Sequence, residues 1–206
     1  MYARTTTIHG TTQAIDDAVA YMRDEVMPAV QDMDGCVGLS FLVDRDTGRC
    51  IVATAWQTEE AMSATADRVR PMRDRLAAVL GGAAEVRTWE IAALHRLHEA
   101  PAGACARVTW LRSDPERADE LLDTFRMGVL PRLEELDGFC SASVLLDRRE
   151  GAAATTVTYA DRAALERNRE AGAAIRERAS RESGAEITDV AEFELVLAHL
   201  RVPETV

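Results

Sequence analysis

The stretch PAVQDMDGCVGLSFLVDRDTGRCIVATAW, residues 28–56, has a counterpart later in the chain in PRLEELDGFCSASVLLDRREGAAATTVTY, residues 131–159. The proline, the Asp-Gly pair, the Asp-Arg turn and the glycine after it all keep one offset of 103 residues (131 − 28). Arg4 and Arg107 share this offset, so the register extends back to the start of each copy. Self-similarity at a fixed spacing is typical of a duplicated unit. We therefore predict that the chain contains two copies of one structural unit.

Each copy has the same order of predicted elements. A Thr- and Val-rich strand precedes a helix whose apolar residues recur at helical spacing. A hairpin of two apolar strands, a second helix and a last strand follow. The resulting order, βαββαβ, is the split βαβ or ferredoxin-like plan. The elements are predicted at 3–8, 15–33, 36–43, 50–56, 58–80 and 85–93, and again at 106–111, 118–136, 139–146, 153–159, 161–181 and 187–197.

Prolines and glycines mark the positions where these helices are expected to bend or end. Pro28 and Pro131 lie late in the first helix of each copy and are predicted to kink it, because proline lacks the N–H of the helical hydrogen bond. Pro71 is predicted to bend the second helix of the first copy. Gly35 and Gly138 are predicted to end the first helical segments at positive φ. The expected helix N-caps are Thr11 or Thr12, Ser113 or Asp114, Thr58 and Asp161.

The predicted fold class is α+β, with two tandem ferredoxin-like units. The units are expected at residues 1–96 and 105–206, with a linker at 97–104 that contains a proline and a glycine. Helices cover one face of each sheet, and the two uncovered faces could pack together. That packing would form an intramolecular dimeric α+β barrel. A barrel closed within one chain predicts a monomer, with a weak homodimer as the alternative.

Composition excludes several classes of function. The chain has 206 residues, 47% of them hydrophobic, and a formal net charge of −11. An acidic chain without a basic cluster is repelled by phosphate backbones, so no nucleic-acid partner is expected. No apolar run approaches the roughly 20 residues that span a bilayer, so no membrane association is expected. The first ten residues do not resemble a signal peptide, and we expect a cytoplasmic protein.

The four cysteines predict neither a disulfide nor a metal site. They form no C-x-x-C pair, and in the predicted hairpin Cys50 faces Val43 and not Cys36. We expect all four to be small buried apolar residues. The DRDTG turn at 44–48 resembles the start of a calcium loop but has Ala55 where the loop needs a glutamate. His95 and His98 provide too few ligands for a metal, so we expect none.

Two motifs resemble one known family. Pro28 followed by the Asp-Gly-Cys turn at 34–36, and the run WQTEEAM at 56–62, resemble the kinked helix and the W-x-s-x-e-A-l signature of the antibiotic-biosynthesis-monooxygenase (ABM) family. The second copy repeats the signature as YADRAAL at 159–165. The resemblance covers nearly the whole chain twice and implies a dimeric α+β barrel. It implies less about chemistry, because one fold hosts many activities.

Some positions depart from the family pattern. Family members often carry a histidine nine residues after the signature Trp, where this chain has Thr65 and, in the second copy, Asn168. The haem-degrading branch has a Trp at this position and an iron-binding histidine nine residues later, where this chain has Asp74 and Glu177. The comparison with the family therefore argues against haem degradation, and no cofactor is expected.

The resemblance implies a cofactor-independent monooxygenase, or a related enzyme, acting on an aromatic or polyketide-like molecule. Such an enzyme needs an apolar pocket, a base, and donors that stabilise the substrate anion before it reacts with oxygen. His9 and His95, at predicted strand ends, are the candidate bases, with a plain surface role as the alternative. The candidate ligand-binding residues, for which core packing is the alternative, are Tyr21, Trp56, Thr65, Trp89, Trp110 and Tyr159.

The alternative to a monooxygenase is a non-catalytic protein with the same fold. Arg4 and Arg107 could bind an anionic substrate or form an ion pair between the copies, and we favour the structural role. Loss of the family histidine from both copies suits a non-catalytic binding or regulatory protein. In either case the expected partner is a small hydrophobic or aromatic ligand. We expect it in the first unit, which keeps the signature Trp56.

Overall fold

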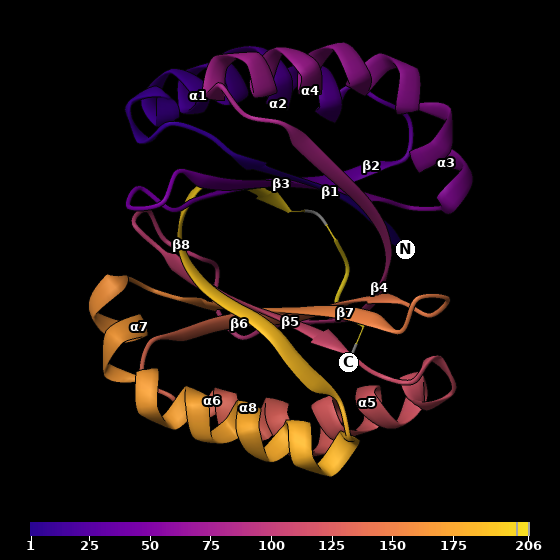
Figure 1. Ribbon diagram of the computed structural model, residues 1–206, viewed down its shortest axis with the longest axis vertical. Coiled ribbons are helices and arrows are strands. Elements are labelled where there is room, and N and C mark those ends of the chain that lie inside the picture. Colours follow the sequence, from indigo (N-terminus) through magenta and orange to yellow (C-terminus); the bar gives the residue numbers. More distant parts are fainter. Residues whose placement is uncertain (201, 206) are drawn as a thin grey trace. The chain divides into compact units, whose positions relative to one another are not determined.

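The computed structural model describes residues 1–200 and 202–205. The first copy contains strands β1, β2, β3 and β4 and helices α1, α2, α3 and α4, and the second repeats this order (Figure 1). In the first copy the bounds are β1 Tyr2–His9, α1 Ile15–Tyr21, α2 Met27–Gln31, β2 Cys36–Val43, β3 Arg49–Trp56, α3 Glu59–Ala64, α4 Ala66–Leu80 and β4 Ala84–Arg96. In the second they are β5 Cys105–Arg112, α5 Ala118–Thr124, α6 Leu130–Glu134, β6 Phe139–Asp147, β7 Ala152–Tyr159, α7 Arg162–Arg167, α8 Arg169–Ser183 and β8 Glu186–Leu200.

The strand order confirms the predicted fold class. The eight strands are hydrogen-bonded in the order β1-β3-β2-β8-β5-β7-β6-β4 of a closed barrel. Equivalent pairs have equivalent registers: Ile8 pairs with Cys50 in the first copy, and Leu111 pairs with Ala153 in the second. The duplication inferred from sequence is therefore a duplication of βαββαβ topology.

The compact units are not the two contiguous sequence copies. Unit 1 comprises Met1–Trp89 and Phe193–Val202, and unit 2 comprises Glu90–Glu192 and Pro203–Val206. In unit 1 the end of β8 pairs with β2, and in unit 2 the end of β4 pairs with β6. Each unit thus takes the end of the other copy's last strand, from Glu90 in β4 and from Phe193 in β8. Both strands also extend beyond the predicted residues 93 and 197.

In each unit the helices pack on one face of the sheet and build the core (Figure 1). In unit 1 the helical stripe expected from spacing is buried at Ile15, Met22 and Val30, against Phe41 and Trp56 of the sheet. The equivalent stripe of unit 2 is buried at Leu122, Phe125 and Leu133. Burial of this apolar stripe is what fixes each helix to its sheet.

In each copy the proline of the first helix lies just after a change in helix type. A π-helical stretch precedes each one, at Met22–Val26 and at Phe125–Val129. Pro28 and Pro131 are then the second residues of α2 and α6. The wider π turn shifts the backbone pairing where proline supplies no N–H, so the helical path continues through the proline.

The second helix of each copy is two helices and not one. It breaks at Thr65 in the first copy and at Asn168 in the second, whereas Pro71 lies inside α4. The Thr65 hydroxyl donates to the carbonyl of Met62 at 2.8 Å. The Asn168 amide donates to the carbonyls of Asp137 and Ala164, both at 2.8 Å. These side chains satisfy backbone carbonyls at the break.

Most local signals were interpreted correctly. The Thr58 and Asp161 side chains accept the N–H groups of Ala61 and Ala164 as N-caps, and Asp114 accepts that of Glu116. Thr11 occupies the N-cap position of its helix without a side-chain hydrogen bond. Gly35 and Gly138 have φ of 78° and 77°. None of the four cysteines forms a disulfide in the structure, and Cys50 faces Val43 as predicted; Cys36 is half-buried and the other three are buried.

Candidate functional site

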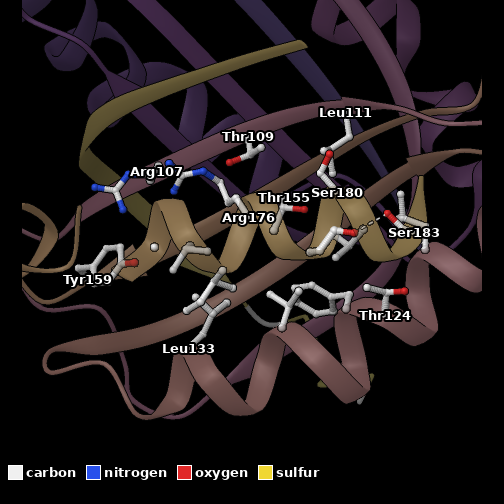
Figure 2. Close-up of a pocket in the computed structure, with 18 residues that line it drawn as sticks. Arg107, Thr109, Leu111, Thr124, Leu133, Thr155, Tyr159, Arg176, Ser180 and Ser183 are labelled. Atoms are coloured by element: carbon white, nitrogen blue, oxygen red, sulfur yellow. Dashed lines mark hydrogen bonds between the residues drawn. The ribbon is translucent and has the colours of Figure 1, made fainter. Parts of the chain in front are cut away.

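Unit 2 contains an apolar cavity between its sheet and its helices. The cavity has a volume of about 70 Å³. The whole empty space at this position, including the part that is open to solvent, is about 700 Å³. Figure 2 shows that α8 forms one of its walls and that α5, with the helical residues that follow it, forms another. Its apolar lining comes from both helical walls and from the sheet, and includes Leu121, Phe125, Val129, Leu133, Val157 and Ile175.

One end of this cavity is cationic. Arg107 from β5, Arg176 from α8 and Tyr159 from β7 gather there, while Ser183 and Thr124 lie toward the other end (Figure 2). Arg107 is 3% exposed. Its NH2 donates to Glu192 Oε1 at 2.8 Å and to the carbonyl of Leu165 at 3.1 Å. Its buried NH1 has no hydrogen-bond partner among the residues described.

Gly172 leaves room for the two guanidinium groups. A Cβ at this helical position would lie 2.9 Å from Arg107 NH1 and 3.4 Å from Arg176 NH1. The Tyr159 hydroxyl would be 3.7 Å from the same point. Any larger side chain would therefore displace Arg107, Arg176 or both from the surface that Gly172 leaves open.

Glu192 balances part of this positive charge. Besides Arg107 it binds Arg169 NH2 at 3.0 Å, and Arg162 NH1 lies 3.6 Å from its Oε2. Burial alone would raise the pKa of Glu192, but its hydrogen bonds to Arg169 and Arg107 outweigh that effect and lower it. Glu192 is therefore ionised at neutral pH and shared among several arginines.

Arg176 has no such partner. It forms no ion pair with any residue in the described part of the chain, although Glu192 and, more weakly, Glu177 contribute favourable charge. Burial, and secondly the neighbouring Arg107, lower the pKa of Arg176. Burial raises the pKa of Tyr159, and the two arginines oppose this rise. Arg176 is half-buried, and a partly desolvated cation without an ion-pair partner is stabilised when an anion joins it.

Unit 1 contains the same cavity in a smaller form of about 40 Å³. Arg4, Arg73 and Thr6 line it at the positions equivalent to Arg107, Arg176 and Thr109. Larger residues fill it: Val69 replaces Gly172, and Leu76 replaces Ala179. Our expectation that the first unit would be the more open half was therefore wrong, because helix side chains set the cavity size and the signature Trp56 is buried beneath them in the core.

The two arginines of unit 1 are also bound differently. Arg4 NH2 donates to the Met62 carbonyl at 2.5 Å, as Arg107 does to Leu165. No carboxylate within the described residues pairs with Arg4, and burial, followed by Arg73, lowers its pKa. Arg73 lies 3.6 Å from the neighbouring Asp74. Each arginine is thus held within its own unit.

The candidate bases lie away from both cavities. His9 is exposed at the end of β1 and lines neither one. The His95 ring stacks on Phe139, with Glu134 Oε1 at 2.7 Å from Nε2 and Glu204 Oε2 at 3.8 Å from Nδ1. The lining of the unit 2 cavity includes no histidine or carboxylate.

Of the candidate ligand-binding residues, Tyr159 lines the unit 2 cavity. Trp56 is fully buried and donates to the Thr54 hydroxyl, and Trp89 donates to the Thr5 hydroxyl. The remaining three line neither cavity: Tyr21 lies beneath the Arg75 guanidinium, Thr65 marks the helix break, and Trp110 is half-buried on β5.

Sequence reasoning missed Gly172, Arg176 and Glu192. One signal could have found the first: at the same repeat position Val69 is replaced by Gly172, inside a helix where glycine costs stability. Nothing local marks Glu192, which reaches Arg107 across 85 residues of chain. Among the described residues no group of three or more potential ligands could hold a metal, and no helix is long and apolar enough to cross a membrane.

Comparison with known proteins places the chain among close relatives. Two proteins of Mycobacterium tuberculosis, named as the uncharacterized proteins Rv2557 and Rv2558, are 50% and 51% identical to it over 100% of this chain and 92% and 88% of their own. The chain belongs to their family. No family model matches it.

Solved structures show that the fold of this family is the ABM type. An anthrone oxidase-like protein matches 99% of this chain and 95% of its own with a TM-score of 0.66 and 15% identity. A ferredoxin-fold protein from Listeria monocytogenes related to antibiotic biosynthesis monooxygenases matches 95% and 94% with a TM-score of 0.56 and 8% identity. A major regulator of staphylococcal pathogenesis matches 95% and 98% with a TM-score of 0.55 and 14% identity. The shared fold therefore accompanies differently named functions.

Proposed function

We propose that the protein binds a small, largely apolar molecule in the unit 2 cavity. The observation that carries this proposal is the difference between two copies of one cavity. Gly172 and Ala179 open in unit 2 the space that Val69 and Leu76 fill in unit 1. A helical glycine costs about 1 kcal/mol relative to alanine, so its presence here suits a site that needs the space. An apolar pocket with a few convergent polar groups is typical of ligand sites.

Titration with single-ring neutral compounds such as phenol and toluene tests the proposal. We expect amide NMR shifts at residues lining the unit 2 cavity, and loss of those shifts in Gly172→Val, which introduces the side chain of unit 1. Gly128→Val is the matched control, because Gly128 lies in a helical segment outside the cavity lining and a Cβ there has no neighbour closer than 3.6 Å. Binding that Gly172→Val leaves unchanged would overturn the proposal.

A second candidate is cofactor-independent oxygenation of the bound molecule. Two guanidinium groups and the Tyr159 hydroxyl could stabilise the anion of an acidic phenol or anthrone, which is the species that would reduce oxygen. Because the lining offers no histidine or carboxylate, the proton would pass to water. In the oxidation of an anthrone to a quinone by O₂, one oxygen atom bonds to the CH₂ carbon of the anthrone. The other oxygen atom leaves as water with the two hydrogens of that carbon.

Oxygen uptake with a panel of anthrones and quinols tests this second candidate. We expect one O₂ consumed per anthrone at a rate that depends on Arg107 and falls in Gly172→Val. His9→Ala and His95→Ala serve as comparison variants, because neither histidine lines the cavity, and we expect unchanged rates. A rate no faster than the reaction without protein would leave binding as the function.

A further inference from the structure

We propose that the unit 2 cavity selects an anionic ligand, a small aromatic acid whose carboxylate binds between Arg107, Arg176 and Tyr159. This inference rests on the proposed binding function and adds the charge of the ligand. We call these three residues the anion subsite.

Arg107 has one hydrogen-bond donor that no described residue uses. Arg107 NH1 is buried without a partner while Nε and NH2 are satisfied by Glu192 and Leu165. Leaving a buried donor unpaired costs free energy, and more for a charged group. A ligand oxygen at the cavity end would supply the missing acceptor.

Three donor groups converge at this end of the cavity. Arg107 NH1, Arg176 NH1 and the Tyr159 hydroxyl lie 2.9, 3.4 and 3.7 Å from the point where Gly172 lacks a Cβ. Three donors from two strands and a helix therefore face one small surface. Planar guanidinium groups match carboxylate geometry, and two of them can bind both oxygens of one carboxylate.

Positive charge is concentrated at this end of the cavity. Around this end Arg107, Arg162 and Arg169 share the single carboxylate of Glu192, and Arg176 adds a further cation. The chain as a whole carries a net charge of −11, so this local excess of positive charge runs against the overall composition. An apolar body followed by two cations therefore suits an aromatic acid better than a neutral compound.

Salicylate and salicylamide test the inference, because they share a ring and hydroxyl and differ in the charged group. Both are titrated calorimetrically against wild type, Arg176→Gln, Arg107→Gln and Gly172→Val at low salt. Arg178→Gln is the matched control, since Arg178 lies on the same helix but is exposed and pairs with Glu182. Circular dichroism confirms that each variant is folded.

We expect wild type to bind salicylate at least about tenfold more tightly than salicylamide, as charge-assisted hydrogen bonds predict. Arg176→Gln and Arg107→Gln should remove most of that preference, because each variant should weaken salicylate far more than salicylamide. Arg178→Gln should keep the preference, and Gly172→Val should weaken both compounds.

Equal affinity of wild type for the two compounds, with both lost in Gly172→Val, would overturn the anion subsite and leave the proposed binding function standing. Salicylate binding that persists in Gly172→Val would also overturn it, because the anion would then bind outside the cavity. Failure of wild type to bind either compound, together with phenol and toluene, would overturn the proposed function itself.

Discussion

Replacement of Glu192 with glutamine tests the charge balance of the cationic end. Glu192 is 23% exposed and accepts two hydrogen bonds from the buried Arg107 guanidinium, at 2.8 and 3.2 Å. Each charge-assisted bond is stronger than its neutral equivalent by about 1–1.5 kcal/mol. The bond to the exposed Arg169 adds little. Glu192→Gln should therefore lower the free energy of unfolding by about 2–3 kcal/mol at pH 7.

The loss should depend on pH. The folded-state pKa of Glu192 lies below its unfolded value, so its stabilisation is present above the unfolded pKa and is lost as pH falls through the folded pKa. Wild type and Glu192→Gln should thus differ most near neutral pH, and the difference in unfolding free energy should shrink progressively as pH falls below the unfolded pKa of Glu192. Urea unfolding followed by tryptophan fluorescence measures this difference at each pH.

Two variants sharpen this experiment. Glu194→Gln is the matched control, because Glu194 pairs on β8 with the exposed Arg45 and should change stability by less than about 0.5 kcal/mol. Adding Arg107→Met to Glu192→Gln should recover part of the loss, because an apolar side chain replaces a buried cation without its carboxylate. A loss below about 1 kcal/mol at pH 7, or one that persists undiminished at pH 3, would show that Glu192 does not stabilise the buried Arg107.

Three further predictions concern local features. Burial and, secondly, the charge of Asp44 raise the pKa of Cys50 to about 11, so only about a thousandth of this thiol is thiolate at pH 8. Iodoacetamide should therefore modify Cys50 in urea but not in the native protein, as mass spectrometry would reveal. Gly138→Ala should lower stability by about 2–3 kcal/mol in urea unfolding, because φ is 77° and the new Cβ would meet that of Ala164 at 2.6 Å; an unchanged midpoint would contradict this. Asp161→Ala should lower the free energy of unfolding by about 1 kcal/mol because it removes a helix N-cap, whereas Asp161→Asn should lower it less; thermal melts of the two variants measure this difference.

The repeat made the fold predictable because its signals are local and occur twice. Caps at Thr58 and Asp161, and glycines at 35 and 138, act within a few residues, and the structure agrees with them. The helix breaks at Thr65 and Asn168 and the π turns before the prolines were missed. Both depend on how each helix accommodates the sheet beneath it, which helical spacing does not report.

The site was harder to predict for a different reason. The aromatic residues proposed for ligand binding are long apolar side chains, and most of them serve the core, as Trp56 does. The residues that form the cationic end are a glycine, arginines and a glutamate, which on the linear sequence look like parts of a solvated helix face and a strand. Their role depends on where α8 lies over β5 and β7.

The duplication, the βαββαβ order, the α+β class and the turns can be predicted from the amino-acid sequence, since each follows from apolar periodicity and from the backbone preferences of single residues. Which copy keeps an open cavity, and which end of that cavity is charged, depends on how the elements pack. Those properties arise where Arg107, Gly172 and Glu192, from three separate elements, meet at distances that chain connectivity does not fix.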